Sequence, residues 1–215
     1  KYCFYEVCNQ LIKDVPIITR VNVNTTSNTN GSIYVEWSKP TEHDAIQWPG
    51  PYRYLIYRGE QTSSNLVLID SVATINDTMY TDAMLNTLGF QYFYRVDIYN
   101  LTSGTRDLMG KSTVASSVYL NLAPSDNKMT LVWNEAVPWT NTQHVIYRQN
   151  PVTFIFDSLD ITSNTFYVDT GLANLTTYCY KVKSVGSYSS PGTINPIENF
   201  SQETCDQPED NIDPC

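Results

Sequence analysis

The stretch YLIYR at residues 54–58 recurs as HVIYR at residues 144–148, and each copy runs into a polar, turn-forming segment. A string that occurs twice is either a site used twice or a structural element built twice. The sequence around the two copies decides between these alternatives, because further blocks match on both sides.

These further blocks follow the same order in the two halves of the 215-residue chain. Together with the opening string they indicate a duplicated unit whose loops differ in length while its strands persist. The first half contains SIYVEW (32–37), LIDSV (68–72), MYTDAML (79–85) and YFYRV (92–96); the second contains KMTLVW (128–133), IFDSL (155–159), FYVDTGL (166–172) and YCYKV (178–182).

Each unit consists of short strands separated by turns. IYVEW and YFYRV alternate polar and apolar residues, and turn sequences such as Asn30-Gly31 and Asp126-Asn127 lie between such blocks. No long stretch has the helical spacing of apolar residues. About seven short strands per unit, with a Trp on the second strand, predict an immunoglobulin-like β-sandwich. The expected fold class is therefore all-β, with two consecutive sandwiches.

Strand alternation places residues 54, 56 and 58 of the opening string on one face. Because Arg58 belongs to this face, we expect it to lie outward as a solvated strand end, with Ile56 beside it. Leu55 and Tyr57 would then point into the core; the alternative is that a bulge resets the alternation. The same pattern is expected for the second copy of the string.

The end of each unit resembles a known family pattern. Leu172 lies six residues before Tyr178 in LANLTTYCYKV, and LNTLGFQYFYRV has Leu85 and Tyr92 in the same roles with one residue inserted. This resembles the fibronectin type III pattern, in which a turn Leu precedes a corner Tyr that begins the sixth strand. The second-strand tryptophans Trp37 and Trp133 also resemble that family.

The resemblance covers most of residues 14 to 206 and implies a domain order. Only a few residues, near Ser112–Ser117, separate the two units, so we expect restricted relative motion. The expected parts are residues 1–13 as the closing strand or linker of an upstream domain, 14–114 and 115–207 as fibronectin type III-like domains, and 208–215 as an acidic linker to a downstream domain.

The five cysteines form no CxxC pair and have no nearby His, so disulfides in an oxidising compartment are the expected use. In the fibronectin-like arrangement, YEVCN (5–9) corresponds to QETCD (202–206), which closes the second unit. That correspondence implies that Cys179 pairs with Cys205 across the sixth and seventh strands. Cys8 would pair with a cysteine that precedes residue 1.

A second resemblance concerns the ends of the chain. CNQLIKDVPIITRVNV (8–23) and SYSSPGTINPIENFSQETCDQPEDNIDPC (187–215) resemble the repeats upstream of the sorting domain in large exported Bacteroidota proteins. Those proteins end in a gliding-motility-associated C-terminal domain that the type IX secretion system reads. The resemblance implies a secreted or cell-surface location and a role in gliding motility or adhesion. The implied partners are flanking domains of the same chain, type IX outer-membrane components or surface glycans.

Proteins of that phylum can carry O-glycans at Asp-Ser or Asp-Thr followed by an apolar residue. The alternative, with equal weight, is that such pairs are simply common in turns. Two of the candidates also lie in matching blocks of the two units. The candidate sites are Ser71, Thr78 and Ser158.

Charge and motifs argue against several function classes. A net charge of −9 and a pI near 4.5 argue against nucleic acid as a partner, and no apolar run of about 18 residues predicts membrane insertion. The sequence contains no nucleophile elbow, phosphate loop or zinc motif, so we predict no enzyme activity, cofactor or metal. A metal or general-base role for His43 or His144 would need partners that converge on the imidazole. His144 occupies the position of Tyr54 in the first unit, so structural or exposed roles are expected for both.

Two loops carry aromatic residues that could bind a ligand. Trp48 and Tyr52 lie in IQWPGPY, and Trp139 lies in the corresponding VPWTNTQ. Exposed aromatics at one end of a sandwich would suit a sugar or protein contact. The favoured alternative is that each Trp caps the end of its own core.

These observations predict non-catalytic spacer and interaction modules of a secreted or cell-surface multidomain protein. Two alternatives stay open. One is a glycan- or protein-binding adhesion module, which requires solvent-exposed Trp48 and Trp139. The other is the ectodomain of a eukaryotic receptor, which would carry N-glycans instead of O-glycans.

Overall fold

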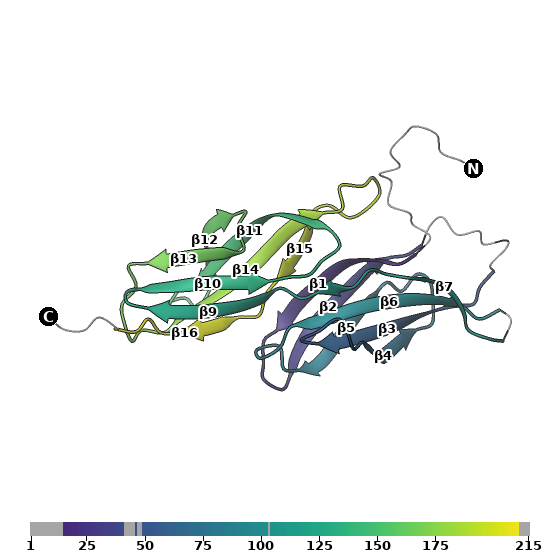
Figure 1. The fold of residues 1–215 in the computed structure, drawn as a ribbon, viewed down its shortest axis with the longest axis horizontal. Coiled ribbons are helices and arrows are strands. Elements are labelled where there is room, and N and C mark those ends of the chain that lie inside the picture. The colour runs from purple at the N-terminus through teal and green to yellow at the C-terminus, as the bar shows by residue number, and fades with distance from the viewer. Residues whose placement is uncertain (1–14, 41–45, 47–48, 103, 211–215) are drawn as a thin grey trace.

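The computed structural model describes residues 15–40, 46, 49–102 and 104–210. Its strands form two β-sandwiches in sequence, which lie one after the other along the long axis of the molecule (Figure 1). The all-β prediction and the duplicated architecture are both confirmed. The segment expected to close an upstream domain and the last residues of the acidic linker lie outside the described residues.

The first sandwich packs a sheet of order β1-β2-β5 against one of order β4-β3-β6-β7, and β8 also pairs with β6. This is the strand arrangement of a fibronectin type III domain. The strands are β1 (Ile17–Thr25), β2 (Gly31–Ser38), β3 (Tyr52–Glu60), β4 (Val67–Val72), β5 (Met79–Leu85), β6 (Tyr92–Asn100), β7 (Asp107–Lys111) and β8 (Ala115–Ser116).

The second sandwich repeats this topology strand for strand, with sheets β13-β10-β9 and β12-β11-β14-β15, and with β16 on β14. Because β8 still pairs with β6, Ala115 and Ser116 belong to the first sandwich, just beyond the boundary expected after residue 114. The strands are β9 (Tyr119–Ser125), β10 (Lys128–Asn134), β11 (Thr140–Gln149), β12 (Phe156–Thr162), β13 (Phe166–Thr170), β14 (Tyr178–Ser187), β15 (Ile197–Phe200) and β16 (Thr204–Asp206).

Regular alternation on the second strand of each unit builds the two cores. In β2, Ile33, Val35 and Trp37 point inward while their neighbours are half-buried, as the sequence pattern predicts. Trp37 and its counterpart Trp133 are 2% and 1% exposed. Each therefore anchors the core of its own sandwich.

Both units contain the corner tyrosine that the family resemblance implies. The backbone N–H of Asn86 donates to the Tyr92 hydroxyl at 3.1 Å, and that of Ala173 donates to the Tyr178 hydroxyl at 3.0 Å. Each bond fixes the turn before the sixth strand of its sandwich.

The predicted orientation of the opening string is wrong. Tyr54 and Ile56 are fully buried, and the register of β3 with β6 pairs Ile56 with Val96 without interruption. Arg58 shares this core face and donates to both carboxylate oxygens of Asp82 at 2.9 Å. Arg58 is therefore an ion-pair partner on the core face of the strand and not a solvated strand end.

Leu55 and Tyr57 lie on the opposite face of β3. Leu55 is buried there, while Tyr57 is half-buried beneath the Arg95 guanidinium, 4.5 Å from its ring centroid. The second copy behaves in the same way, since Ile146 is fully buried.

Arg148 donates to Asp169 at 2.7 Å in the second sandwich, and there the Tyr180 hydroxyl donates to the same carboxylate at 2.9 Å. The Tyr94 hydroxyl makes the matching bond in the first sandwich. Since the Arg and the Asp come from different sheets, the repeated string builds an inter-sheet tie twice.

Candidate functional site at the domain seam

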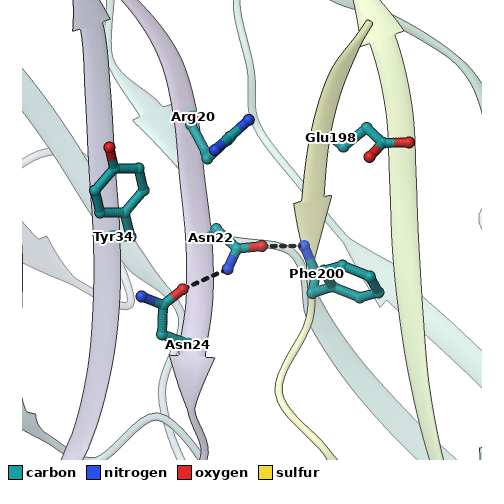
Figure 2. Close-up of a pocket in the computed structure, with 6 residues that line it drawn as sticks. All are labelled: Arg20, Asn22, Asn24, Tyr34, Glu198 and Phe200. Carbon is teal, nitrogen blue, oxygen red and sulfur yellow. Dashed lines mark hydrogen bonds between the residues drawn. The ribbon is translucent and has the colours of Figure 1, made fainter. Parts of the chain in front are cut away.

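The edge strand β1 of the first sandwich lies beside β15 of the second, and we call this contact the seam. The backbone N–H of Val21 donates to Oδ1 of Asn199 at 2.7 Å. In the reverse direction, the backbone N–H of Phe200 donates to Oδ1 of Asn22 at 2.7 Å (Figure 2). The two asparagines thus form a reciprocal clamp between two sheet edges.

The clamp satisfies backbone groups that an edge strand otherwise leaves unpaired. Asn199 is only 1% exposed. The Asn22 amide is held in turn, because its Nδ2 donates to Asn24 Oδ1 at 2.6 Å. The Tyr188 hydroxyl adds a further link by donating to the Ile18 carbonyl at 2.7 Å.

A second set of contacts holds the junction where the chain passes between the sandwiches. The backbone N–H of Ser116 donates to the Ala136 carbonyl at 2.9 Å, and the N–H of Ala136 donates to Ser116 Oγ at 2.7 Å. Gln91 Nε2 donates to Ser116 Oγ and to the Asn134 carbonyl. The sandwiches are therefore fixed to each other at two separate places.

A groove of about 420 Å³ opens along the seam (Figure 2). Side chains of the first sandwich form one wall, residues of β15 form the other, and the clamp lies between them. The groove is lined by Arg20, Asn22, Asn24, Tyr34, Glu198 and Phe200.

The charged groups of the groove are paired. Arg20 lies 3.5 Å from Glu36, and Lys183 lies 2.8 Å from Glu198. The hydrogen bond that Lys183 Nζ donates to Glu198 raises the pKa of Lys183. Because both signs are present and matched, the groove suits a neutral polar ligand better than a strongly charged one.

The loop aromatics do not form the expected surface. Trp139 is 6% exposed, its Nε1 donates to Asn141 Oδ1 at 2.9 Å, and its ring meets Tyr188 edge-on at 5.8 Å. It packs with Ile197 in a cluster continuous with the first core, so it belongs to the junction and does not cap its own core alone. The exposure that a sugar contact by Trp139 requires is not met.

The other two aromatic candidates, Trp48 and Tyr52, are close in sequence. Tyr52 is half-buried at the start of β3. Trp48 lies outside the described residues. The predicted trio therefore does not come together as a described surface.

The candidate O-glycosylation sites are distributed over both sandwiches. Ser71 and Ser158 are exposed on the equivalent edge strands β4 and β12, and Thr78 is half-buried. Ser71 pairs with Leu55, whereas Ser158 pairs with Tyr147. The two serines therefore occupy equivalent strands but not equivalent positions, and their modification stays a prediction.

His144 has a structural role, as predicted. It is 2% exposed, its ring lies 5.1 Å from Trp133, and its Nε2 lies 2.9 Å from Glu135 Oε1. It takes the place that Tyr54 has beside Trp37 in the first sandwich. His43 lies outside the described residues.

The predicted disulfide between Cys179 and Cys205 is confirmed, and it joins β14 to β16. Cys8 lies outside the described residues. Within those residues, no three His, Cys, Asp or Glu side chains gather as a potential metal site. The described part of the chain also has no helix with the length and apolar character needed to cross a membrane.

Sequence reasoning missed the seam residues Asn22 and Asn199. They lie far apart in a chain rich in asparagine, and neither is part of a recognisable motif. The only related signal was the short connection between the units, which predicted restricted motion but not its cause.

Comparisons with known proteins add a fold-level likeness. No protein-family model matches the chain, and no curated protein matches it. The central fibronectin-III array of RIM-binding protein is 14% identical and aligns over 94% of this chain and 71% of that one, with a TM-score of 0.33. The FN1–FN3 domains of chicken CNTN1 are 11% identical over 90% of this chain and 68% of that one, with a TM-score of 0.32.

Proposed function

We propose that the chain is a rigid, non-catalytic pair of domains that holds flanking parts of a longer extracellular protein at a fixed distance and orientation. The observation that carries this proposal is the reciprocal clamp of Asn22 and Asn199. Each clamp bond is worth about 1 kcal/mol net. Opening the seam would also expose the buried side chains of Trp139 and Ile197.

The cystine between Cys179 and Cys205 supports an oxidising, extracytoplasmic location. Export by the type IX system, a bacterial surface location and a role in gliding or adhesion rest on the sequence resemblance of the chain ends. Intact-mass measurement of protein from its native source tests this part. O-glycans on Ser71 or Ser158 would support it, whereas N-glycans would support the receptor-ectodomain alternative.

The spacer function is tested by the distance distribution between spin labels on the two sandwiches. Labels at S64C and S163C occupy exposed positions, with Cys3, Cys8 and Cys215 replaced by Ser. We expect one narrow distance for the otherwise unchanged chain and a distribution at least about twice as broad for N22A/N199A. N121A, an exposed asparagine on β9, is the matched control.

A broad distribution in the unchanged chain would refute a rigid spacer. A double variant that is as narrow as the control would show that the junction contacts of Ser116 and Ala136, and not the clamp, fix the domains. Circular dichroism of each variant establishes that both sandwiches remain folded.

A second candidate function is glycan contact in the groove. Tyr34 and Phe200 line the groove together with the amides of Asn22 and Asn24, and aromatic faces with amide groups suit the C–H faces and hydroxyls of a neutral sugar. An array of neutral oligosaccharides tests it. We expect binding that Y34A and F200A abolish and that F154A, a remote exposed control, retains. An unchanged chain that binds no glycan on the array would end this candidate.

A further inference from the structure

The last strand of each sandwich is attached to the sixth strand at an equivalent position. In the second sandwich, β16 pairs with β14 through Tyr178 with Asp206, Cys179 with Cys205, and Tyr180 with Thr204. Because the two units share the same strand order, Tyr94 on β6 is the counterpart of Tyr180. Tyr94 pairs with Ala115. We call the next pair outward, Cys179 with Cys205, the exit pair.

The exit pair of the first sandwich is Phe93 with Ser116. It contains no cysteine, but it is fastened as well. Ser116 exchanges two hydrogen bonds with Ala136 of the second sandwich and accepts a third from Gln91. The same position is thus secured twice, once by the neighbouring domain and once by a covalent bond.

The exit pair is where a pull on the chain end would act. β16 runs antiparallel to β14 and the chain leaves it after Asp206, so a pull that draws this end away from β14 separates the outermost pair first. The pair of Tyr178 with Asp206 is loaded first, and the cystine is next. Peeling from this end therefore stops after a single pair.

The chain leaving β8 follows the same order. The backbone N–H of Ser117 donates to the Tyr92 carbonyl at 2.9 Å, and this link is loaded first. The next position is Ser116, which the second sandwich holds. This protection lasts only while the junction is closed.

We propose that the two exit pairs let the chain bear tension along its length, with the cystine as a permanent stop and Ser116 as a conditional one. The inference rests on the proposed spacer function and adds an order of failure to it. Under load the junction opens first, the first sandwich unfolds next, and the second sandwich unfolds last.

Single-molecule force spectroscopy of the full chain, with handles at both termini, tests this order. The contour gain identifies each sandwich, because the cystine hides a loop closed over a sequence separation of 26. At about 3.5 Å per extended residue, C179S/C205S should lengthen the gain of the second sandwich by about 90 Å. That change in contour length identifies which unfolding event belongs to the second sandwich, and it does not by itself test the proposal.

The force is the decisive readout. We expect C179S/C205S to lower the unfolding force of the second sandwich to about that of the first and to add an early low-force step as β16 detaches. S116A should lower the force at which the junction opens and leave the unfolding force of the second sandwich unchanged. As a matched control, a handle at residue 163 in place of the C-terminus bypasses β16, and the cysteine variant should then unfold at an unchanged force.

An equal unfolding force for the second sandwich with and without the cystine, pulled through the C-terminus, would overturn the proposal. Unfolding of the second sandwich before the first in the oxidised chain would do the same. Neither result affects the spin-label distances, so failure of tension bearing is distinguishable from failure of the rigid spacer.

Discussion

At the scale of single residues, the inter-sheet tie explains why an arginine occupies the core face of a strand. The Asp82 carboxylate is 4% exposed, and it accepts from both Arg58 and the hydroxyl of Tyr94. A buried charge is tolerated when a partner of opposite sign and further hydrogen bonds compensate it. The duplicated tie in the second sandwich shows that this solution belongs to the repeated unit.

Removal of the carboxylate should therefore destabilise the first sandwich strongly. D82A leaves Arg58 and the Tyr94 hydroxyl without their shared acceptor, and we expect a loss of about 3 kcal/mol in its free energy of unfolding. Urea denaturation measures this loss. D70A, which removes an exposed carboxylate, is the control and should cost less than about 0.5 kcal/mol. Equal effects of the two substitutions would contradict the role of the tie.

The same tie makes a prediction for alkaline pH. Burial, followed by the nearby Asp82 carboxylate, raises the pKa of Tyr94 well above 10. Burial and the Asp169 hydrogen bond raise the pKa of Tyr180 as well. A raised folded-state pKa means that stability is full below the unfolded-state pKa, near 10, and declines above it.

We therefore expect the free energy of unfolding to fall above pH 10, with a slope that approaches about 1.4 kcal/mol per pH unit for each such tyrosine. Urea titrations at several pH values measure the slope. Y94F and Y180F should each reduce this slope by the contribution of one proton, because phenylalanine does not ionise. A slope unchanged by both substitutions would show that other groups cause the decline.

At the scale of strands, the sequence predicted those elements whose apolar residues follow the strand period without interruption. β2 and β10 have their Trp and alternation where expected, and the corner tyrosines and the cystine follow from the family pattern. The prediction for β3 was wrong because a periodicity rule assigns every Arg to solvent. Only the distant Asp82, across the sheet-to-sheet gap, reverses that assignment.

The predicted match between the edge strands β4 and β12 was wrong for a different reason. Both β3–β4 and β11–β12 contain a bulge, which falls after Ile56 and after Ile146. Ile56 pairs with Asp70 and Ile146 pairs with Asp160, so Asp70 and Asp160 occupy equivalent positions. The sequence blocks LIDSV and IFDSL are therefore not structural equivalents. An inserted residue of this kind has no sequence signature in these strands.

The corrected face of β3 is open to direct measurement. Ile56 is fully buried, so I56A should lower the free energy of unfolding of the first sandwich by about 3 kcal/mol. V67A on the neighbouring β4, where the side chain is 59% exposed, should change it by less than about 0.5 kcal/mol. If I56A is as mild as V67A, the core face has been misassigned.

At the scale of the whole molecule, the junction between the two sandwiches is buried like the interior of a domain. Ala115, Ser116, Ser117 and Val118 are all 2% exposed or less. The sequence predicted restricted motion here from the short connection alone, but it could not predict the burial. That burial comes with contacts between the sandwiches, such as that of Ser116 with Ala136, which no pattern in the sequence indicates.

A buried junction should resist proteolysis. Elastase cleaves after small residues, which this segment offers, yet we expect the native chain to remain uncut there because cleavage needs an extended, accessible backbone. N22A/N199A should become measurably more susceptible at the same segment, as seen by mass spectrometry of the fragments. Rapid separation of the unchanged chain into its two sandwiches would contradict a closed junction.

The clamp itself is not duplicated, although the domains are. Strand register gives Ala123 on β9 as the counterpart of Asn22, and Gly110 on β7 as the counterpart of Asn199. A Cβ at Gly110 would lie 2.4 Å from Val15 Cγ1, so that position is already covered. A head-to-tail contact that repeats without closing produces filaments. Because the equivalent edges have Ala123 and Gly110 in place of the two asparagines, each chain can make this joint only once, and we expect that copies of the chain do not polymerise through it.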